Sequence, residues 1–259
     1  GRLDDFSALG QSVMASFDTR ATPDIAGAER GIALLKQLMA EKRANPDDSF
    51  LSTLINHVED GERINEAEAI GLLASLFAAG VATTSDALNV AVYSLARNPA
   101  WSEWLAQHPE RVLDVLAEAT RWWAGTHRGY TRFAKVDMEI NGQRVHKGEM
   151  VQLMNVASAF DELTFHNACE FNPARADLKH FLFFGEGTHY CLGHALAKLI
   201  TGTALLALVQ RYPQFTLKQA PRIHYAIRAY HIEGLAIRGI AADSEAIATT
   251  LSSPVSQAA

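Results

Sequence analysis

A chain of 259 residues, 48% of them hydrophobic and 20% charged, is long enough to bury a substantial core in one domain or two. Its formal net charge of −6 at pH 7 argues against a nucleic-acid partner, because surfaces that bind nucleic acid are basic. The two cysteines, Cys169 and Cys191, provide no disulfide framework, which is typical of a protein from a reducing cytoplasm.

Helical patterns occupy most of the chain. The Asn98–Pro99 pair marks the end of the longest one, because proline cannot continue a helix. We expect helices over residues 4–16, 23–44, 49–58, 65–98, 99–108, 109–123 and 193–212. The last of these is apolar on nearly every face, which predicts a buried helix.

Between residues 126 and 175 the pattern changes to short strands and turns. Asn141–Gly142 separates two strand-like triplets at 138–140 and 143–145, and an Asn-Gly pair in this position predicts a β-hairpin. We also expect β-structure at 215–217 and within 223–240. Residues 241–259 are small and polar without periodicity, so we expect one domain over 1–240 followed by a disordered tail.

The apolar run at 71–96 is long enough to span a membrane. It contains polar residues along its length, including Ser75, Asp86 and Asn89. We therefore interpret it as a buried helix of a cytoplasmic protein and expect no membrane partner.

Cys191 lies in the stretch Phe-Gly-Glu-Gly-Thr-His-Tyr-Cys-Leu-Gly at 184–193, directly before an apolar helical run. At a helix N-terminus, unpaired backbone N–H groups and the helix dipole favour a thiolate. Gly185 and Gly187 allow a flat ligand to approach the main chain. A thiolate held in this way can be the axial ligand of a heme iron; the alternative is an inert cysteine buried at a helix start.

Two weaker patterns precede this loop. Glu118 and Arg121 are three residues apart on an expected helix, so they can pair on one face, although such pairs are mostly surface ion pairs. Residues 79–84, Ala-Gly-Val-Ala-Thr-Thr, have small side chains that let a helix pass close over a flat cofactor. Taken alone, this segment would predict only a close helix crossing.

The spacing at 184–193 resembles the heme-binding loop of bacterial cytochrome P-450 enzymes, and the Glu-x-x-Arg pair and residues 79–84 precede it in the order of that family. The resemblance implies the cytochrome P-450 fold, mainly α with small β-sheets, and heme b as the cofactor. Cys191 would be the axial iron ligand, and His189 and Arg132 would contact heme propionates. The other cofactor-binding residues that the resemblance implies are Phe184, Gly185, Gly193, Ala79 and Gly80.

The resemblance also assigns roles outside the loop. Thr83, with Thr84 beside it, would be the catalytic alcohol that hydrogen-bonds dioxygen and relays protons. Glu118 and Arg121 would form a structural pair. The substrate pocket would be lined by Thr126, His127, Arg128 and Tyr130.

Three features depart from the family pattern. The acid that usually precedes the catalytic threonine is replaced by Ala82, so the proton source is open. Glu170 occupies the place where an arginine is expected to join Glu118 and Arg121, and the nearby Arg175 is its possible substitute. The chain begins with Gly1-Arg2 and has no counterpart of the family's long N-terminal portion, so we expect the remainder of a longer protein rather than a naturally short relative.

These features together predict a heme-thiolate monooxygenase that inserts one oxygen atom of dioxygen into a small organic substrate. Its electrons would come from a separate ferredoxin and ferredoxin reductase. Ala82 leaves open a relative that uses peroxide instead. A non-catalytic accessory protein that stabilises a partner enzyme is a further alternative, and the presence of Cys191 argues against it.

Overall fold

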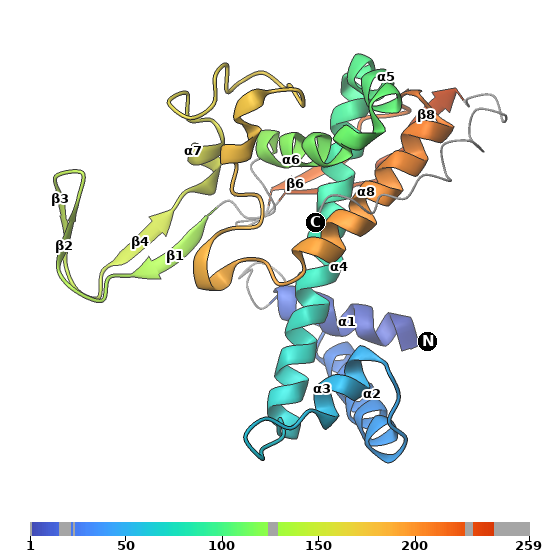
Figure 1. Cartoon of the computed structure of the whole chain (residues 1–259), viewed down its shortest axis with the longest axis vertical. Helices are drawn as coiled ribbons and strands as arrows, with labels where there is room; N and C mark the ends of the chain where they lie inside the picture. Colours follow the sequence, from blue (N-terminus) through green and yellow to red (C-terminus); the bar gives the residue numbers. More distant parts are fainter. Residues whose placement is uncertain (1, 16–21, 23, 124–128, 226–229, 241–259) are drawn as a thin grey trace. The chain divides into compact units, whose positions relative to one another are not determined.

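The computed structural model describes residues 2–15, 22, 24–123, 129–225 and 230–240. The expected tail at 241–259 lies outside them, so the boundary at residue 240 stays a prediction. The chain divides into two compact units, residues 1–83 and 84–259, and each is taken by itself (Figure 1).

Helices dominate the described residues, as the sequence predicts. The α-helices are α1 Arg2–Ala15, α2 Ile25–Ala44, α3 Phe50–Asn56, α4 Glu66–Arg97, α5 Pro99–Gln107, α6 Val112–Trp122, α7 Asn155–Ala159 and α8 His194–Arg211. Short 3-10 helices are η1 Pro109–Arg111, η2 Ala176–His180 and η3 Gly187–His189. The strands are β1 Tyr130–Phe133, β2 Met138–Ile140, β3 Gln143–Val145, β4 Met150–Leu153, β5 Gln214–Leu217, β6 Arg222–Tyr225, β7 Tyr230–Glu233 and β8 Ile237–Ile240.

The first unit consists of α1, α2, α3 and the first part of α4. Side-chain caps define two helix starts, because the Asp24 carboxylate accepts from the Gly27 N–H and the Ser49 hydroxyl accepts from the Ser52 N–H. A Cβ added at Gly31 of α2 would lie 2.6 Å from the Leu9 Cβ of α1, so glycine permits this close helix contact. The buried core of the unit consists of Leu9, Leu35, Met39, Ile55, Ala69 and Leu73.

The core of the second unit lies between the last part of α4, α5, α6, α8 and β5. Its buried side chains are Val90, Ala91, Tyr93, Leu95, Ala96, Leu105, Val112, Val115, Leu116, Ala119, Phe171, Leu205, Leu206, Val209, Phe215 and Ile232. Helix α5 and helix α6 pack against α8. These contacts determine which part of α8 is buried.

The prediction that α8 is a buried helix is wrong for its first half. Thr201, Gly202, Leu205, Leu206 and Val209 are buried. In contrast, the side chains nearer the helix start are exposed: Leu196 at 61%, Leu199 at 55% and Ile200 at 47%. The reason is that the packing partners of α8 cover its second half only.

Helix α4 also departs from the prediction of a buried helix. Leu72 and Val81 are exposed, at 38% and 53%, whereas Asp86 and the core residues at the end of the helix are buried. Among the described residues, α4 is the single helix that is long and apolar enough to cross a membrane. Length and composition alone are weak grounds for a membrane span, because core helices of soluble proteins share them.

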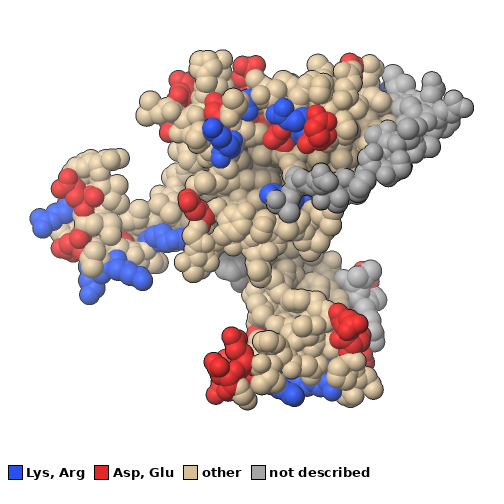
Figure 2. Space-filling view, in the orientation of Figure 1, with Lys and Arg blue, Asp and Glu red and all other residues tan. Residues whose placement is uncertain are grey.

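The strands form four antiparallel pairs, β1–β4, β2–β3, β5–β8 and β6–β7, within the described residues. The predicted hairpin is confirmed: Ile140 pairs with Gln143, and Asn141 and Gly142 have φ angles of 47° and 77°. Two positive φ angles are those of a type I′ turn, which suits the twist of a hairpin. Figure 2 shows acidic and basic side chains together on this hairpin, where Glu139 lies opposite Arg144.

Candidate active site

The cysteine loop closes on itself through backbone hydrogen bonds. The Cys191 N–H donates to the Phe184 carbonyl at 2.9 Å, and the Tyr190 N–H donates to the Gly187 carbonyl at 3.0 Å. Gly185 and Gly187 have φ angles of 75° and 72°, in the left-handed region that favours glycine. The turn therefore brings the half-buried Cys191 back beside Phe184, just before α8 begins.

Aromatic and cationic side chains surround Phe184. Its ring lies 4.3 Å from the Phe183 ring and 6.0 Å from the His194 ring, and the Lys198 ammonium lies 5.7 Å from its centroid. His189, at the end of η3, is exposed. Gly193 caps α8 without a side chain, and a Cβ added there would meet no atom within 4 Å.

Tyr130 and Arg132 of β1 belong to the same region as Cys191. Burial raises the pKa of Tyr130, the Arg132 guanidinium acts to lower it, and the charge of Cys191 acts to raise it further. The Arg132 guanidinium lies 5.6 Å from the Tyr130 ring and donates to the Thr131 carbonyl at 2.9 Å. Strand β1 thus carries both the predicted propionate partner and one predicted pocket residue, and the predicted thiol ligand acts electrostatically on the latter.

A buried ion-pair network lies at the start of the segment that leads to the loop. Arg121 donates from Nε to Glu118 Oε2 at 2.7 Å and from Nη2 to Glu118 Oε1 at 2.9 Å. Arg175 donates from Nε to Glu118 Oε1 at 3.2 Å. The side chains of Glu118 and Arg121 are 0% exposed and that of Arg175 is 4% exposed, so this pair is not an ordinary surface ion pair.

Of the two outcomes left open for this place, the structure has Arg175 in the network and not the Glu170 side chain. The Glu170 residue is exposed, and only its backbone carbonyl takes part, accepting from Arg121 Nη2 and Arg175 Nη2 at 3.2 Å each. A side chain that points to solvent avoids the repulsion that a second buried carboxylate would suffer beside Glu118. The alternative in which Arg175 substitutes is therefore the one that the structure shows.

The network reaches further than the sequence indicates. Arg121 Nη1 donates to the Ala168 carbonyl at 2.9 Å and also binds the Ala159 carbonyl. Asp177 accepts from Arg175 Nη1 at 3.0 Å and from the His166 N–H at 2.8 Å. Burial acts to raise the pKa of Asp177, but the His166 N–H and the Arg175 guanidinium outweigh it and hold the pKa below its ordinary value.

These contacts fasten residues 159–177 to α6. Many of the hydrogen bonds from the two guanidinium groups go to backbone carbonyls, and no pattern of side chains in the sequence predicts which carbonyls these are. Asp177 was missed for a related reason: the two groups that it binds lie in a loop of irregular backbone.

The segment 79–84 belongs to α4. The Thr83 hydroxyl donates to the Ala79 carbonyl, one helical turn earlier, while Ala79 and Gly80 are exposed and Thr84 is half-buried. A Cβ added at Gly80 would meet no atom within 4 Å. The expected pocket residues Thr126, His127 and Arg128 lie outside the described residues.

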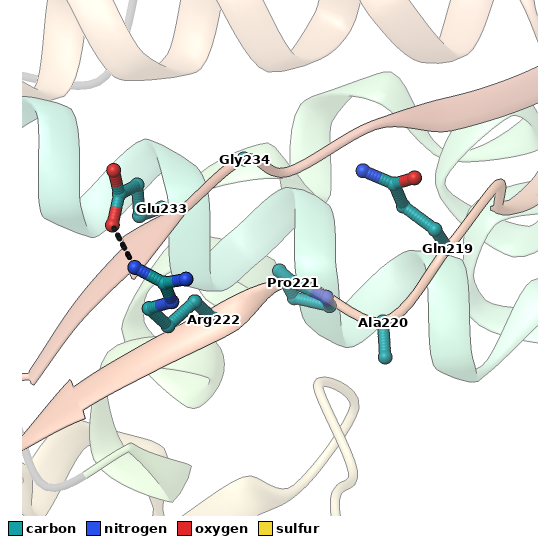
Figure 3. A pocket seen from close by; sticks show the side chains of 6 residues that line it. All are labelled: Gln219, Ala220, Pro221, Arg222, Glu233 and Gly234. Carbon is teal, nitrogen blue, oxygen red and sulfur yellow. Dashed lines mark ion pairs between the residues drawn. The ribbon is translucent and has the colours of Figure 1, made fainter.

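A separate hollow of about 390 Å³ lies at the base of the β6–β7 hairpin, lined by Gln219, Ala220, Pro221, Arg222, Glu233 and Gly234 (Figure 3). Arg222 Nη1 and Glu233 Oε2 face each other across it at 3.9 Å. The lining contains none of the residues that the sequence assigns to the site.

The family model described as "Cytochrome P450" matches this chain over residues 11–115 and 112–224. The chain belongs to the cytochrome P-450 family. The epothilone C/D epoxidase of Sorangium cellulosum is 31% identical over 229 residues, which are 88% of this chain and 54% of that protein. The mycinamicin IV hydroxylase/epoxidase of Micromonospora griseorubida is 28% identical, with 83% of this chain and 54% of that protein covered.

Solved cytochrome P-450 structures have the same fold. An epothilone D-bound cytochrome P-450 (epoK) superposes with a TM-score of 0.82 at 30% identity, over 90% of this chain and 60% of that one. The resemblance found in the sequence and the fold expected from it are therefore confirmed. This chain spans about half the length of the curated relatives that it matches.

Membership in the cytochrome P-450 family implies a heme, and the side chains at the cysteine loop fit this cofactor. Among the residues that the structure describes, no group of three or more His, Cys, Asp and Glu side chains could hold a metal ion. Cys191 instead offers a single thiol. Apolar side chains beside it are exposed, Leu192 at 80% and Leu196 at 61%, which suits a large apolar cofactor with one protein ligand.

Proposed function

We propose that this chain forms the heme-thiolate part of a monooxygenase that inserts one oxygen atom of dioxygen into a small organic substrate. The observation that carries the proposal is the cysteine loop: two glycines with positive φ angles and the hydrogen bond from the Cys191 N–H to Phe184 fix one thiol before α8. Cytochrome P-450 relatives whose names are epoxidase and hydroxylase support the reaction type.

The cofactor would be heme b, which supplies the activation of dioxygen once it is bound. Cys191 would ligate the iron, and Phe184 would shield one side of the thiolate from water. Arg132 and His189 would bind the propionates through charge-assisted hydrogen bonds. The network of Glu118, Arg121 and Arg175 holds no cofactor in this proposal and only anchors the segment before the loop.

Proton delivery would depend on Thr83. Its hydroxyl donates to the Ala79 carbonyl in this structure, so it would relay a proton only after it turns away from that carbonyl. Ala82 supplies no carboxylate, so an ordered water or another side chain would provide the proton. The absence of a carboxylate at Ala82 also favours a second candidate function, that of a heme-thiolate enzyme that uses peroxide as its oxidant.

The electrons would come from a separate ferredoxin-type donor, and the protein would work in the cytoplasm. Tyr130 would contribute to the substrate pocket together with residues 126–128. The alternative of a non-catalytic accessory protein would not need the thiol of Cys191.

The test compares two sources of oxidising equivalents on the heme-loaded protein. Product formation with NADH, ferredoxin and reductase under air supports the monooxygenase, and product formation with peroxide alone supports the second candidate. Cys191→Ala serves as the control, because the variant loses the proposed iron ligand. Turnover by neither route, with substrates that shift the heme spectrum, would contradict both candidates.

A further inference from the structure

A second hollow, of about 160 Å³, lies between the last turn of α4 and the end of α6, both in the second unit. None of the residues around it is among those assigned to the heme, to dioxygen or to the substrate. Its volume is close to that of an engineered protein cavity of about 150 Å³ that binds benzene, so a single six-membered ring fits. The lining consists of Tyr93, Ser94, Arg97, Asn98, Trp122 and Trp123.

Three aromatic side chains line this hollow, and contacts with neighbouring side chains hold them in place. The Trp123 indole N–H donates to the Ser94 hydroxyl at 3.2 Å, and the Trp123 ring meets the Tyr93 ring edge to face at 5.2 Å. Tyr93 and Ser94 are buried, and the Trp122 ring packs against the Phe160 ring at 5.9 Å. Walls that are already ordered lose little conformational freedom when a ligand binds.

The charged and amide groups at the hollow are hydrogen-bond donors. The guanidinium of Arg97 lies over the Tyr93 ring, 5.8 Å from its centroid, and no carboxylate in the described part of the chain forms an ion pair with it. An amide nitrogen has two hydrogens, and Asn98 Nδ2 uses one of them on the Ser94 carbonyl at 2.8 Å. The lining contains no Asp or Glu, so these donors favour an anionic ligand.

We propose that this hollow binds a small aromatic carboxylate, a ligand of the benzoate class. The guanidinium of Arg97 pairs with the carboxylate through two parallel hydrogen bonds. The ring of the ligand lies against the tyrosine and tryptophan rings in the offset or edge-to-face geometry that aromatic pairs prefer. The site does not depend on the proposed heme-thiolate function.

A purely structural role for Arg97 makes different predictions. Arg97 is the basic residue in the last turn of α4, where a positive charge stabilises the helix end without any ligand. Arg97→Lys keeps that charge, but an ammonium lacks the planar fork that binds both oxygens of a carboxylate.

The helix ends oppose the charge of Arg97, because carbonyl groups at a helix C-terminus carry partial negative charge and attract cations. Two of these carbonyls already accept hydrogen bonds, that of Ser94 from Asn98 Nδ2 and that of Ala119 from the Trp123 N–H. The sign of the ligand's charge is therefore the sharpest test.

Benzoate, benzamide and benzylammonium provide that test, because they share the ring and differ in charge. The readout is the NMR signal of the indole N–H groups in the nitrogen-15-labelled protein, which needs no heme. Trp122 and Trp123 line the hollow, and Trp104, which stacks on His108 outside it, is the internal reference. Benzoate should shift the signals of Trp122 and Trp123 with a Kd of about 1 mM or below and leave Trp104 unchanged.

Benzamide and benzylammonium should bind about 10-fold more weakly than benzoate, since hydrogen bonds to a charged group contribute this much even where water competes. Benzylammonium binding as tightly as benzoate would overturn the proposal and indicate a cation site instead. Unchanged Trp122 and Trp123 signals at saturating benzoate would overturn it as well.

Variants at position 97 separate the guanidinium from the aromatic walls. Arg97→Gln should weaken benzoate binding about 10-fold, and Arg97→Lys should give an intermediate Kd. Arg43→Gln is the matched control, because Arg43 is also an exposed arginine in the last turn of a helix, α2, and it should match the wild type. An unchanged Kd in Arg97→Gln would overturn the proposal, and if that variant fails to fold, the three ligands on the wild type still decide.

Discussion

Glu118→Gln removes the charge at the centre of the buried network. The Glu118 carboxylate accepts from Arg121 Nε at 2.7 Å, Arg121 Nη2 at 2.9 Å, the Asn172 N–H at 2.8 Å and Arg175 Nε at 3.2 Å. Both guanidinium groups are buried, with side chains 0% and 4% exposed. The substitution therefore leaves Arg121 without a carboxylate and Arg175 with Asp177 alone.

Removing one partner of a buried ion pair costs about 3–5 kcal/mol, out of about 5–15 kcal/mol that stabilise a typical protein. We expect Glu118→Gln to lower the free energy of unfolding by about this amount, measured by urea denaturation followed by circular dichroism. Glu170→Gln is the matched control, because Glu170 is exposed and a surface change of this kind costs at most about 0.5 kcal/mol. Equal losses in the two variants would refute the assignment of Glu118, rather than Glu170, to the network.

Three further predictions concern other parts of the chain. Hydrogen bonds from Lys42 and Ser49 lower the pKa of Asp47 to about 2 from the ordinary 3.8. The ionised Asp47 carboxylate therefore stabilises the folded chain fully above about pH 4, and this stabilisation disappears as the pH falls through about 2. A titration of the Asp47 carboxyl carbon by NMR with a midpoint near 3.8 would contradict this prediction. Thr83→Ala should raise peroxide release per NADH consumed, and Thr83→Ser should not; unchanged product yield in Thr83→Ala would show that the hydroxyl only fills the helix. Leu192 and Leu196 are exposed beside the cysteine loop, and exposed apolar patches promote association. Residues 1–259 expressed alone should therefore bind heme poorly and self-associate. A monodisperse monomer with one tightly held heme would disprove this prediction.

Local backbone chemistry explains why much of the fold could be predicted from the sequence. The ends of the long helix α4 are marked by polar residues and by Pro99, and the structure has the helix over Glu66–Arg97. The hairpin follows from Asn141–Gly142, which accept positive φ angles. The cysteine loop was predictable in the same way, since Gly185 and Gly187 adopt the backbone angles that glycine favours.

The parts that sequence patterns missed depend on contacts between distant segments. Spacing left open whether Arg175 joins Glu118 in place of the usual arginine, because the irregular backbone between residues 167 and 175, which turns the Arg175 side chain inward, has no sequence signal. Carbonyl groups such as that of Ala168 carry no sequence signal, although they bind Arg121. Apolar composition likewise predicted that α8 is buried, but only packing partners decide burial, and they cover only its second half.

The central claim, that Cys191 ligates a heme iron as a thiolate, is tested most directly by the absorption spectrum of the reduced protein under CO. We expect the heme-loaded wild type to show the red-shifted Soret band of thiolate ligation, because the loop holds this thiol just before the N-terminus of α8. Cys191→Ala should lose the band, and Cys169→Ala, at the other and exposed cysteine, should keep it. A band that persists in Cys191→Ala, or that is absent from the wild type with heme bound, would contradict the account.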